Sequence, residues 1–129
     1  MEGRFVSEVW KSVPGFSDYQ VSSNGRVKRI KNHLGQDIDR PMARTLNPNG
    51  YYKMLLHQKG KGATRYVHEM VANAFHGAPK GDRNQINHKN GNKQNNKASN
   101  LEWTTRSENM KHAYDAGLVG GKGANKKPD

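Results

Sequence analysis

The chain has no cysteine among its 129 residues, which excludes disulfide bonds and every zinc site that depends on cysteine ligands. Hydrophobic residues make up only 32% of the chain and the mean hydropathy is −1.09, so we expect a modest core. No apolar run approaches the roughly 20 residues of a membrane-spanning helix, and residues 1–5 form no apolar signal region. The sequence therefore predicts a small folded protein with long polar loops, located in the cytoplasm and without membrane contact.

Acidic residues are also scarce. Eleven aspartates and glutamates stand against 22 lysines and arginines, which gives a formal net charge of +11 and an isoelectric point of about 10.0. An excess of this size attracts polyanions and accelerates the encounter with them. Charge alone does not distinguish DNA from RNA or from an acidic membrane surface, so the partner has to be inferred from the motifs.

The first third of the chain predicts a small β unit. Residues 19–22 and 26–30 alternate in polarity around the turn Ser23-Asn24-Gly25, which is the pattern of an antiparallel hairpin. In the second strand Val27 would face the core, and three cations would face solvent: Arg26, Lys28 and Arg29. These cations form either an ordinary solvated face or a nucleic-acid contact. Residues 32–49 are polar and contain two prolines, and are expected to be a connector or long loop.

A second hairpin and a helix follow. Strands are expected at residues 50–57 and 63–67, with a glycine-lysine turn between them. An apolar stripe with helical spacing then runs through Val67, Met70, Val71, Ala74 and Phe75. The stripe predicts an amphipathic helix that packs on the core. His68, at the start of this helix, has either a capping or packing role or a functional one.

Residues 84–116 predict a strand, an asparagine-rich loop, a second strand and a helix. Thr105 and Glu108 have the spacing of a capping box at the start of that helix. His88 follows Asn87, and further amide side chains stand at Asn100 and Asn109. An imidazole and oxygen ligands that converge in a basic chain would suit metal-assisted cleavage of a phosphodiester, whereas an ordinary polar loop is the alternative.

Both halves of the chain resemble known sequences, up to about residue 117. The C-terminal half carries the following motifs: Val67-His68, Asn87-His88-Lys89-Asn90-Gly91-Asn92-Lys93, Asn95-Asn96, Asn100-Leu101-Glu102-Trp103-Thr104 and Ser107-Glu108-Asn109. They resemble the HNH endonucleases with the ββα-metal fold, in the phage and intron-encoded branch. The N-terminal motifs are Trp10-Lys11, Pro14-Gly15-Phe16, Tyr19-Gln20-Val21-Ser22 and Asn24-Gly25-Arg26-Val27. They resemble the small β module that often precedes this nuclease domain.

The resemblance implies an α+β fold in which N-terminal antiparallel β hairpins precede a ββα-metal (His-Me finger) motif. It divides the chain into three parts: an N-terminal β module at 1–47, a nuclease domain at 48–117 with its ββα core at 84–116, and a disordered basic tail at 118–129. His88 matches the general base, and Asn100 matches the residue that orients the imidazole through its far nitrogen. Asn87 and Asn109 match the protein ligands of one divalent metal. His112 stands three residues after Asn109 on a similar helix face, so it is either a fallback ligand or a histidine that meets the C-terminal helix dipole.

The function implied is a metal-dependent endonuclease that hydrolyses phosphodiester bonds in double-stranded DNA, as a site-preferring nickase of phage or mobile-element origin in a bacterial host cell. One Mg²⁺ or Mn²⁺ ion is expected. Since neutral amides bind a hard cation weakly, the metal would bind mainly once DNA phosphate completes its ligand shell. A sequence-reading DNA-binding protein with a weak or inactive site, and an RNA-binding module, are the alternatives. We expect a monomer, with a dimer as the alternative.

The duplex is expected to be gripped on either side of the cut by the N-terminal β module and the second hairpin. The candidate DNA-binding residues are Arg26, Lys28, Arg29, Lys53 and Arg65. On this hypothesis, deleting residues 1–47 would weaken or redirect binding while leaving His88 and its metal site folded.

Overall fold

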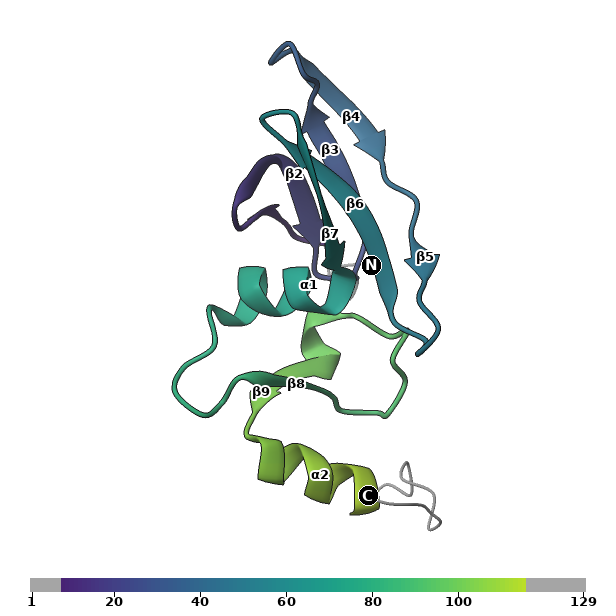
Figure 1. The fold of residues 1–129 in the computed structure, drawn as a ribbon, viewed down its shortest axis with the longest axis vertical. Coiled ribbons are helices and arrows are strands. Elements are labelled where there is room, and N and C mark those ends of the chain that lie inside the picture. Colours follow the sequence, from purple (N-terminus) through teal and green to yellow (C-terminus); the bar gives the residue numbers. More distant parts are fainter. Residues whose placement is uncertain (1–7, 116–129) are drawn as a thin grey trace, which may run out of the picture.

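The computed structural model describes residues 8–115, which form a mixed α+β fold. The two larger antiparallel sheets occupy one end of the long axis, α1 lies beneath them, and the β8–β9 hairpin and α2 lie at the other end (Figure 1). The strands are β1 (Trp10–Val13), β2 (Phe16–Ser22), β3 (Val27–Lys31), β4 (Asp37–Pro41), β5 (Thr45–Leu46), β6 (Tyr52–Gln58), β7 (Lys61–Tyr66), β8 (Gln85–His88) and β9 (Leu101–Thr104). The helices are α1 (Val67–His76), the short 3-10 helix η2 (Ala98–Asn100) and α2 (Arg106–Asp115).

The first sheet has the strand order β1-β2-β3-β4 and contains the hairpin expected from the sequence. Its β2–β3 turn includes Gly25 at a φ of +83°, a conformation that favours glycine. Residues 32–49 are not a simple connector, because they contribute β4 to this sheet and β5 to the next. β4 is a polar edge strand that buries no side chain, so its sequence carries no apolar alternation.

The second sheet has the order β5-β6-β7 and confirms the second predicted hairpin. Its turn is tight, with Lys59 and Gly60 both at positive φ. Alternation along β6 buries Met54 and Leu56, while Leu55 is exposed on the other face.

One hydrophobic core joins the two sheets to α1. Its buried members are Val13, Phe16, Tyr19, Val21, Val27, Met54, Leu56, Val67, Met70, Val71 and Leu101. Tyr19 is completely buried, and its hydroxyl oxygen accepts a hydrogen bond from the backbone N–H of His57 at 3.0 Å. The apolar stripe of α1 lies against this core as the sequence predicts. Core residues therefore lie on both sides of the boundary predicted at residues 47 and 48.

The C-terminal part has the predicted order of strand, loop, strand and helix. β8 pairs antiparallel with β9, and α2 follows directly. The capping box is confirmed, because Glu108 N–H donates to Thr105 Oγ1 at 3.1 Å and Thr105 N–H donates to Glu108 Oε1 at 3.2 Å. The predicted tail at 118–129 lies outside the described residues. None of the helices within residues 8–115 is long and apolar enough to cross a membrane.

Candidate active site

A hollow of about 250 Å³ brings together three of the residues that the sequence singled out. Asn87 and His88 reach it from the end of β8, and Asn109 reaches it from α2. Its other lining residues include Tyr51, Lys93 and His112. The short β8–β9 hairpin and the helix that follows are what place these side chains together, although Asn87 and Asn109 are far apart in sequence.

His88 is buried at 7% exposure, and its ring has one clear polar partner. Nε2 lies 2.8 Å from Oδ1 of Asn96 in the long loop. Burial lowers the pKa of His88, the bond to Asn96 partly opposes this effect, and the nearby Lys93 lowers the pKa further. The imidazole is therefore neutral at neutral pH, and in the tautomer that donates from Nε2 its Nδ1 has a free lone pair.

The Asn100 side chain forms no hydrogen bond with the imidazole of His88, so the geometric expectation for this residue is wrong. Its amide nitrogen donates to Asn95 O at 2.8 Å and to Asn90 Oδ1 at 3.1 Å, and its Oδ1 accepts from Asn90 N–H at 3.0 Å. These bonds turn the Asn100 side chain toward the loop backbone. The contact to the far nitrogen comes instead from Asn96, to which the sequence assigned no role. Asn96 stands next to Asn95 in a run of similar residues, so only the fold distinguishes it.

The two candidate metal ligands share one hydrogen-bond pattern. The amide nitrogen of Asn87 donates to Glu102 Oε2 at 2.8 Å, and that of Asn109 donates to Gln85 Oε1 at 3.2 Å. In each case the NH₂ group is engaged, and the carbonyl oxygen is the atom available to a hard cation. Residues 8–115 contain no group of three or more histidine, cysteine, aspartate or glutamate side chains suited to a metal. His112, the fallback ligand, has its Nε2 3.0 Å from Lys89 O.

A cluster of aromatic rings backs His88. The ring centroid of His68 lies 5.3 Å from that of His88, 5.0 Å from that of Tyr51 and 5.6 Å from that of Tyr66. His68 thus packs within this cluster. Its buried Nδ1 has no hydrogen-bond partner among the described residues. Burial, with a smaller contribution from His88, lowers the pKa of His68 to about 4.

This environment predicts an acid-sensitive fold. Because the pKa of His68 is about 4 in the folded protein and 6.5 as its ordinary value, the unfolded chain binds this proton more tightly. The free energy of unfolding should have its full value above pH 6.5 and should fall as the pH drops toward 4. Protonation of His68 should account for up to about 3 kcal/mol of this loss. Urea unfolding of His68→Phe, which keeps a ring in the cluster, should show a clearly weaker pH dependence. His33→Phe, at an exposed histidine, is the matched control. An unchanged pH dependence in His68→Phe would contradict the account.

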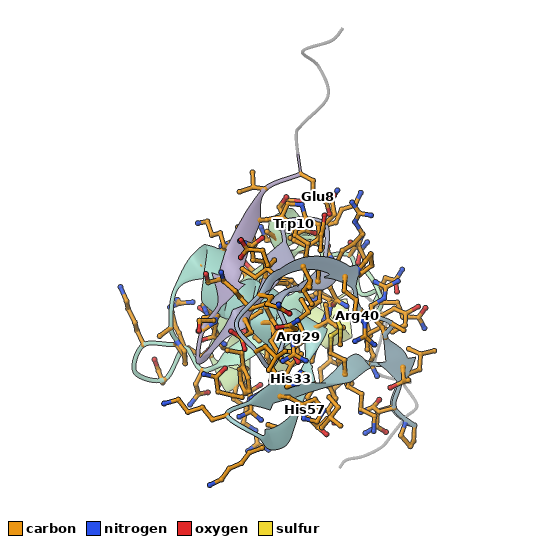
Figure 2. All side chains as sticks on the ribbon, turned by 90° about the horizontal axis from the view of Figure 1, so that it is seen from above. Glu8, Trp10, Arg29, His33, Arg40 and His57 are labelled. Atoms are coloured by element: carbon orange, nitrogen blue, oxygen red, sulfur yellow. The ribbon has the colours of Figure 1, made fainter. Side chains whose placement is uncertain are left out.

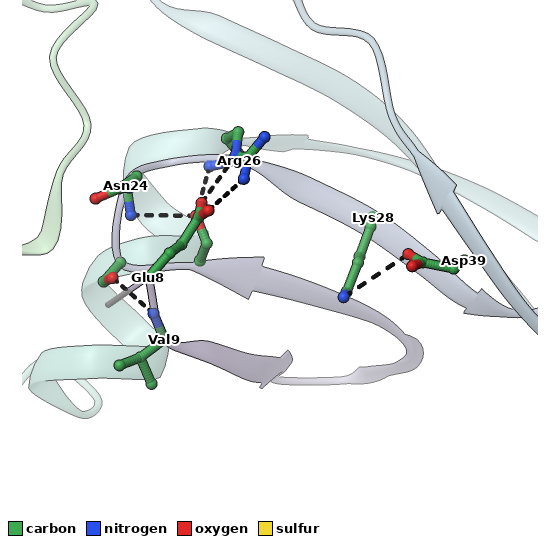
Figure 3. Close-up of polar contacts among 8 residues, drawn as sticks. Glu8, Val9, Asn24, Arg26, Lys28 and Asp39 are labelled. Atoms are coloured by element: carbon green, nitrogen blue, oxygen red, sulfur yellow. Dashed lines mark hydrogen bonds and ion pairs between the residues drawn. The ribbon is translucent and has the colours of Figure 1, made fainter. Parts of the chain in front are cut away.

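The three predicted DNA-binding cations of the first sheet are paired with acidic side chains. Arg26 forms an ion pair with Glu8, and Lys28 lies 3.7 Å from Asp39 (Figure 3). Arg29 is 4.0 Å from Asp18. Arg29 also lines a hollow with His33 and His57, and these three residues gather on one side in Figure 2, away from Glu8 and Trp10. The β3–β4 turn beside this hollow is at the opposite end of the long axis from β8 and α2 (Figure 1).

The two predicted cations of the second hairpin do not lie on one face. Arg65 is opposite Met54 in the ladder and packs its guanidinium 5.1 Å from the centroid of the Phe16 ring. Lys53 is opposite Tyr66, on the other face of the sheet. The cation that does line the His88 hollow is Lys93, whose Nζ lies 5.0 Å from the centroid of the Tyr51 ring. From the sequence, Lys93 was named only as the last residue of the motif that begins at Asn87, and it was given no role.

The chain matches two family models in tandem. Residues 8–57 match the NUMOD4 motif, and residues 65–111 match the HNH endonuclease family. The second range contains the whole β8–β9 hairpin, the loop between its strands and the first half of α2.

Curated proteins and a solved structure show the same likeness. The chain is 38% identical over 117 residues to an uncharacterized HNH endonuclease of Acanthamoeba polyphaga mimivirus, a match that spans 88% of this chain and 28% of that protein. It is 34% identical over 112 residues to the DNA endonuclease I-HmuI of Bacillus phage SP01, which spans 85% of this chain and 60% of that protein. The chain thus spans less than two thirds of the length of each of these relatives.

The solved structure concerns DNA binding and cleavage by the HNH homing endonuclease I-HmuI. It superposes with a TM-score of 0.70 at 31% identity, over 86% of this chain and 60% of that one. A coverage of 86% is too large to leave out either the N-terminal sheet or the ββα part, which agrees with the two family models. The chain belongs to the HNH endonuclease family, with a NUMOD4 motif ahead of its HNH domain.

Proposed function

We propose that this chain is a metal-dependent endonuclease that hydrolyses a phosphodiester bond of double-stranded DNA. The observation that carries the proposal is the hollow in which a neutral His88 stands beside the amide side chains of Asn87 and Asn109. Because residues 8–115 hold this one His88 site and one site cuts one bond, we propose that the monomer nicks one strand. The net charge of +11 suits a polyanionic substrate.

His88 would act as the general base. With Nε2 held by Asn96, the free lone pair of Nδ1 can take the proton of the attacking water. A lowered pKa keeps the imidazole unprotonated at neutral pH, so the base is in its active form before DNA binds. In this account Asn96 fixes the tautomer and the ring orientation, which is the role that the sequence assigned to Asn100. Asn100 instead holds the loop that carries Asn96.

Asn87 and Asn109 would hold one divalent metal ion through their carbonyl oxygens. When bound, a Mg²⁺ or Mn²⁺ ion supplies a Lewis acid that stabilises charge on the scissile phosphate and on the leaving 3′ oxygen. The donor set fits a hard cation, since both amide nitrogens are already bound to neighbouring side chains. The Glu102 carboxylate next to Asn87 provides the negative charge that the two amides lack. DNA phosphate would complete the ligand shell.

Cation binding can be tested without DNA. Asn87→Asp should lower the melting temperature of the metal-free protein, because it replaces the hydrogen bond to Glu102 by two facing carboxylates. The same variant should gain more thermal stability from Mn²⁺ than the unaltered protein does, since a carboxylate binds the ion more strongly than an amide. Melting curves against Mn²⁺ concentration measure both effects.

Asn87→Ala is the matched control, because it loses the hydrogen bond without adding a charge. It should show no added stabilisation by Mn²⁺. The metal site would be misplaced if Mn²⁺ stabilised Asn87→Asp no more than Asn87→Ala. The corresponding test of activity is cleavage of duplex DNA, which excess chelator should stop.

We propose that Lys93 joins the predicted DNA contacts, because it is the cation that lines the His88 hollow. Among the five cations expected from the sequence, Arg26, Lys28 and Arg29 each already face an acidic side chain, so a phosphate would have to share the cation with that partner or exchange with it. Such an exchange reduces the net gain in binding free energy. Lys53 and Arg65 have no ion pair within residues 8–115, and they remain candidates on opposite faces of the second hairpin.

A further inference from the structure

The β2–β3 turn of the N-terminal sheet contacts the loop that holds the His88 ring. The N–H of Ala98, two residues after Asn96, donates to the carbonyl oxygen of Ser23 at 2.8 Å. Gly25 packs directly on Asn96, so closely that a Cβ at Gly25 would lie 3.1 Å from both Cβ and O of Asn96. The turn thus touches the one residue whose side chain binds Nε2 of His88.

Asn96 depends on this packing for its position. The residue is 2% exposed, and Nδ2 of its side chain has no hydrogen-bond partner among the described residues. The side chain is therefore fixed by its contact with His88 and by the placement of its own backbone. That backbone is placed by Gly25 on one side and by the anchored η2 on the other, where Ala98 O lies 2.7 Å from His76 Nε2.

The turn is itself rigidly built. The buried Ser22 hydroxyl oxygen accepts the N–H groups of Asn24 and Arg26, each at 3.1 Å (Figure 3). Ser23 and Val9 exchange two hydrogen bonds, at 2.8 and 3.0 Å. The ion pair of Arg26 with Glu8 ties the same turn to the start of the described chain. The hydrogen bond from Arg26 lowers the pKa of Glu8 to about 2, and a hydrogen bond from Ser22 makes a smaller contribution in the same direction.

We infer that the N-terminal β module positions the general base, through the contact chain from Gly25 to Asn96 to His88. The module is then part of the catalytic machinery in addition to any grip on DNA, and Gly25 is a positioning residue. The expected change in cleavage rate rests on the proposed function. The expected change in the His88 ring does not, because it concerns only the hydrogen bond to Asn96.

The chain offers a matched pair of glycine substitutions for the test. Gly25 and Gly35 both sit in turns of the same sheet at positive φ, +83° and +77°, so alanine strains the backbone similarly at either position. Only at Gly25 would the added Cβ meet another residue, since the space around Gly35 is open. Any difference between Gly25→Ala and Gly35→Ala therefore reports the contact with Asn96.

Single-turnover cleavage of saturating duplex DNA is the first readout. Gly25→Ala should cleave about 10- to 100-fold more slowly than the unaltered protein, because a small displacement of a reacting group has an effect of this order. Gly35→Ala should cleave at nearly the unaltered rate, and both variants should bind the duplex with similar affinity. A role in DNA binding alone would instead raise the dissociation constant and leave the saturated rate unchanged.

The ¹⁵N chemical shifts of the His88 ring are the second readout, recorded without DNA or metal. The unaltered protein and Gly35→Ala should show the tautomer protonated at Nε2, and Gly25→Ala should show a mixture. If Gly25→Ala does not fold, Ala98→Pro takes its place, because it removes the N–H that binds Ser23. Unaltered ring signals together with an unaltered rate in the variant would overturn the inference. If the unaltered protein does not cleave DNA, the proposed function fails and the ring signals still decide this inference.

Discussion

Replacing His88 with alanine should abolish cleavage of duplex DNA while leaving duplex binding largely intact. The imidazole acts on the attacking water and does not hold the DNA, so its loss should lower the single-turnover rate by about two to four orders of magnitude. The ring makes one hydrogen bond, to Asn96, and it lines the hollow. The loss of this one bond should leave the variant folded. Rates are measured with excess protein and Mg²⁺ or Mn²⁺, and affinities are measured in chelator.

His33→Ala is the matched control for this substitution, because it removes an exposed histidine of the β3–β4 turn, and this turn lies at the opposite end of the long axis from β8. It should cleave at the unaltered rate. The cleavage rate of Asn96→Ala should lie between the rates of these two variants. This substitution leaves His88 in place but removes the hydrogen bond that fixes its tautomer. A His88→Ala variant that cleaves at a near-normal rate would show that another group removes the proton.

Deleting residues 1–47 should leave the rest of the chain unable to fold, contrary to the expectation from the sequence that the His88 site would survive. Five of the eleven buried core residues lie in this part: Val13, Phe16, Tyr19, Val21 and Val27. Burial of five such side chains contributes on the order of 10 kcal/mol, which is comparable to the whole stability of a typical domain. The fragment should show neither a cooperative thermal transition nor dispersed NMR signals.

A pair of point variants tests the same claim in the intact chain. Tyr19→Ala should destabilise the protein by about 3–5 kcal/mol, because Tyr19 is fully buried and binds the His57 N–H. Leu34→Ala, in the β3–β4 turn of the same sheet, should change stability by less than about 0.5 kcal/mol, since Leu34 is 68% exposed. A well-folded fragment 48–129, or a Tyr19→Ala variant as stable as Leu34→Ala, would show that the two parts have separate cores.

The parts of the fold that sequence could predict are those with a local signal. The stripe from Val67 to Phe75 has helical spacing, the Thr105 and Glu108 pair has the spacing of a cap, and both were found as predicted. β4 could not be predicted, because a solvated edge strand is held by its backbone bonds to β3 and buries none of its side chains. The shared core was also missed, since contacts between distant segments leave no periodic pattern.

The candidate site shows the same division. The sequence predicted that Asn87, His88 and Asn109 belong to one site and that they lie on a strand and a helix. These three residues do line one hollow. The partner of the imidazole could not, because several asparagines follow His88 within one loop and only the loop's path selects Asn96 over Asn100. The acidic partners of Arg26 and Arg29 were missed for a similar reason, since Glu8 comes from the segment before β1 and Asp18 comes from the neighbouring strand β2.

The central claim is that the His88 hollow hydrolyses DNA with the help of a divalent metal ion. Its most direct test is incubation of the unaltered protein with a phage-sized genomic duplex, with Mg²⁺ or Mn²⁺ and in parallel with excess chelator, followed by run-off sequencing of both strands. We predict breaks at discrete positions on one strand, leaving 3′-hydroxyl ends, and no breaks in chelator. An intact, folded protein that makes no breaks with either metal, or breaks that persist in excess chelator, would contradict it.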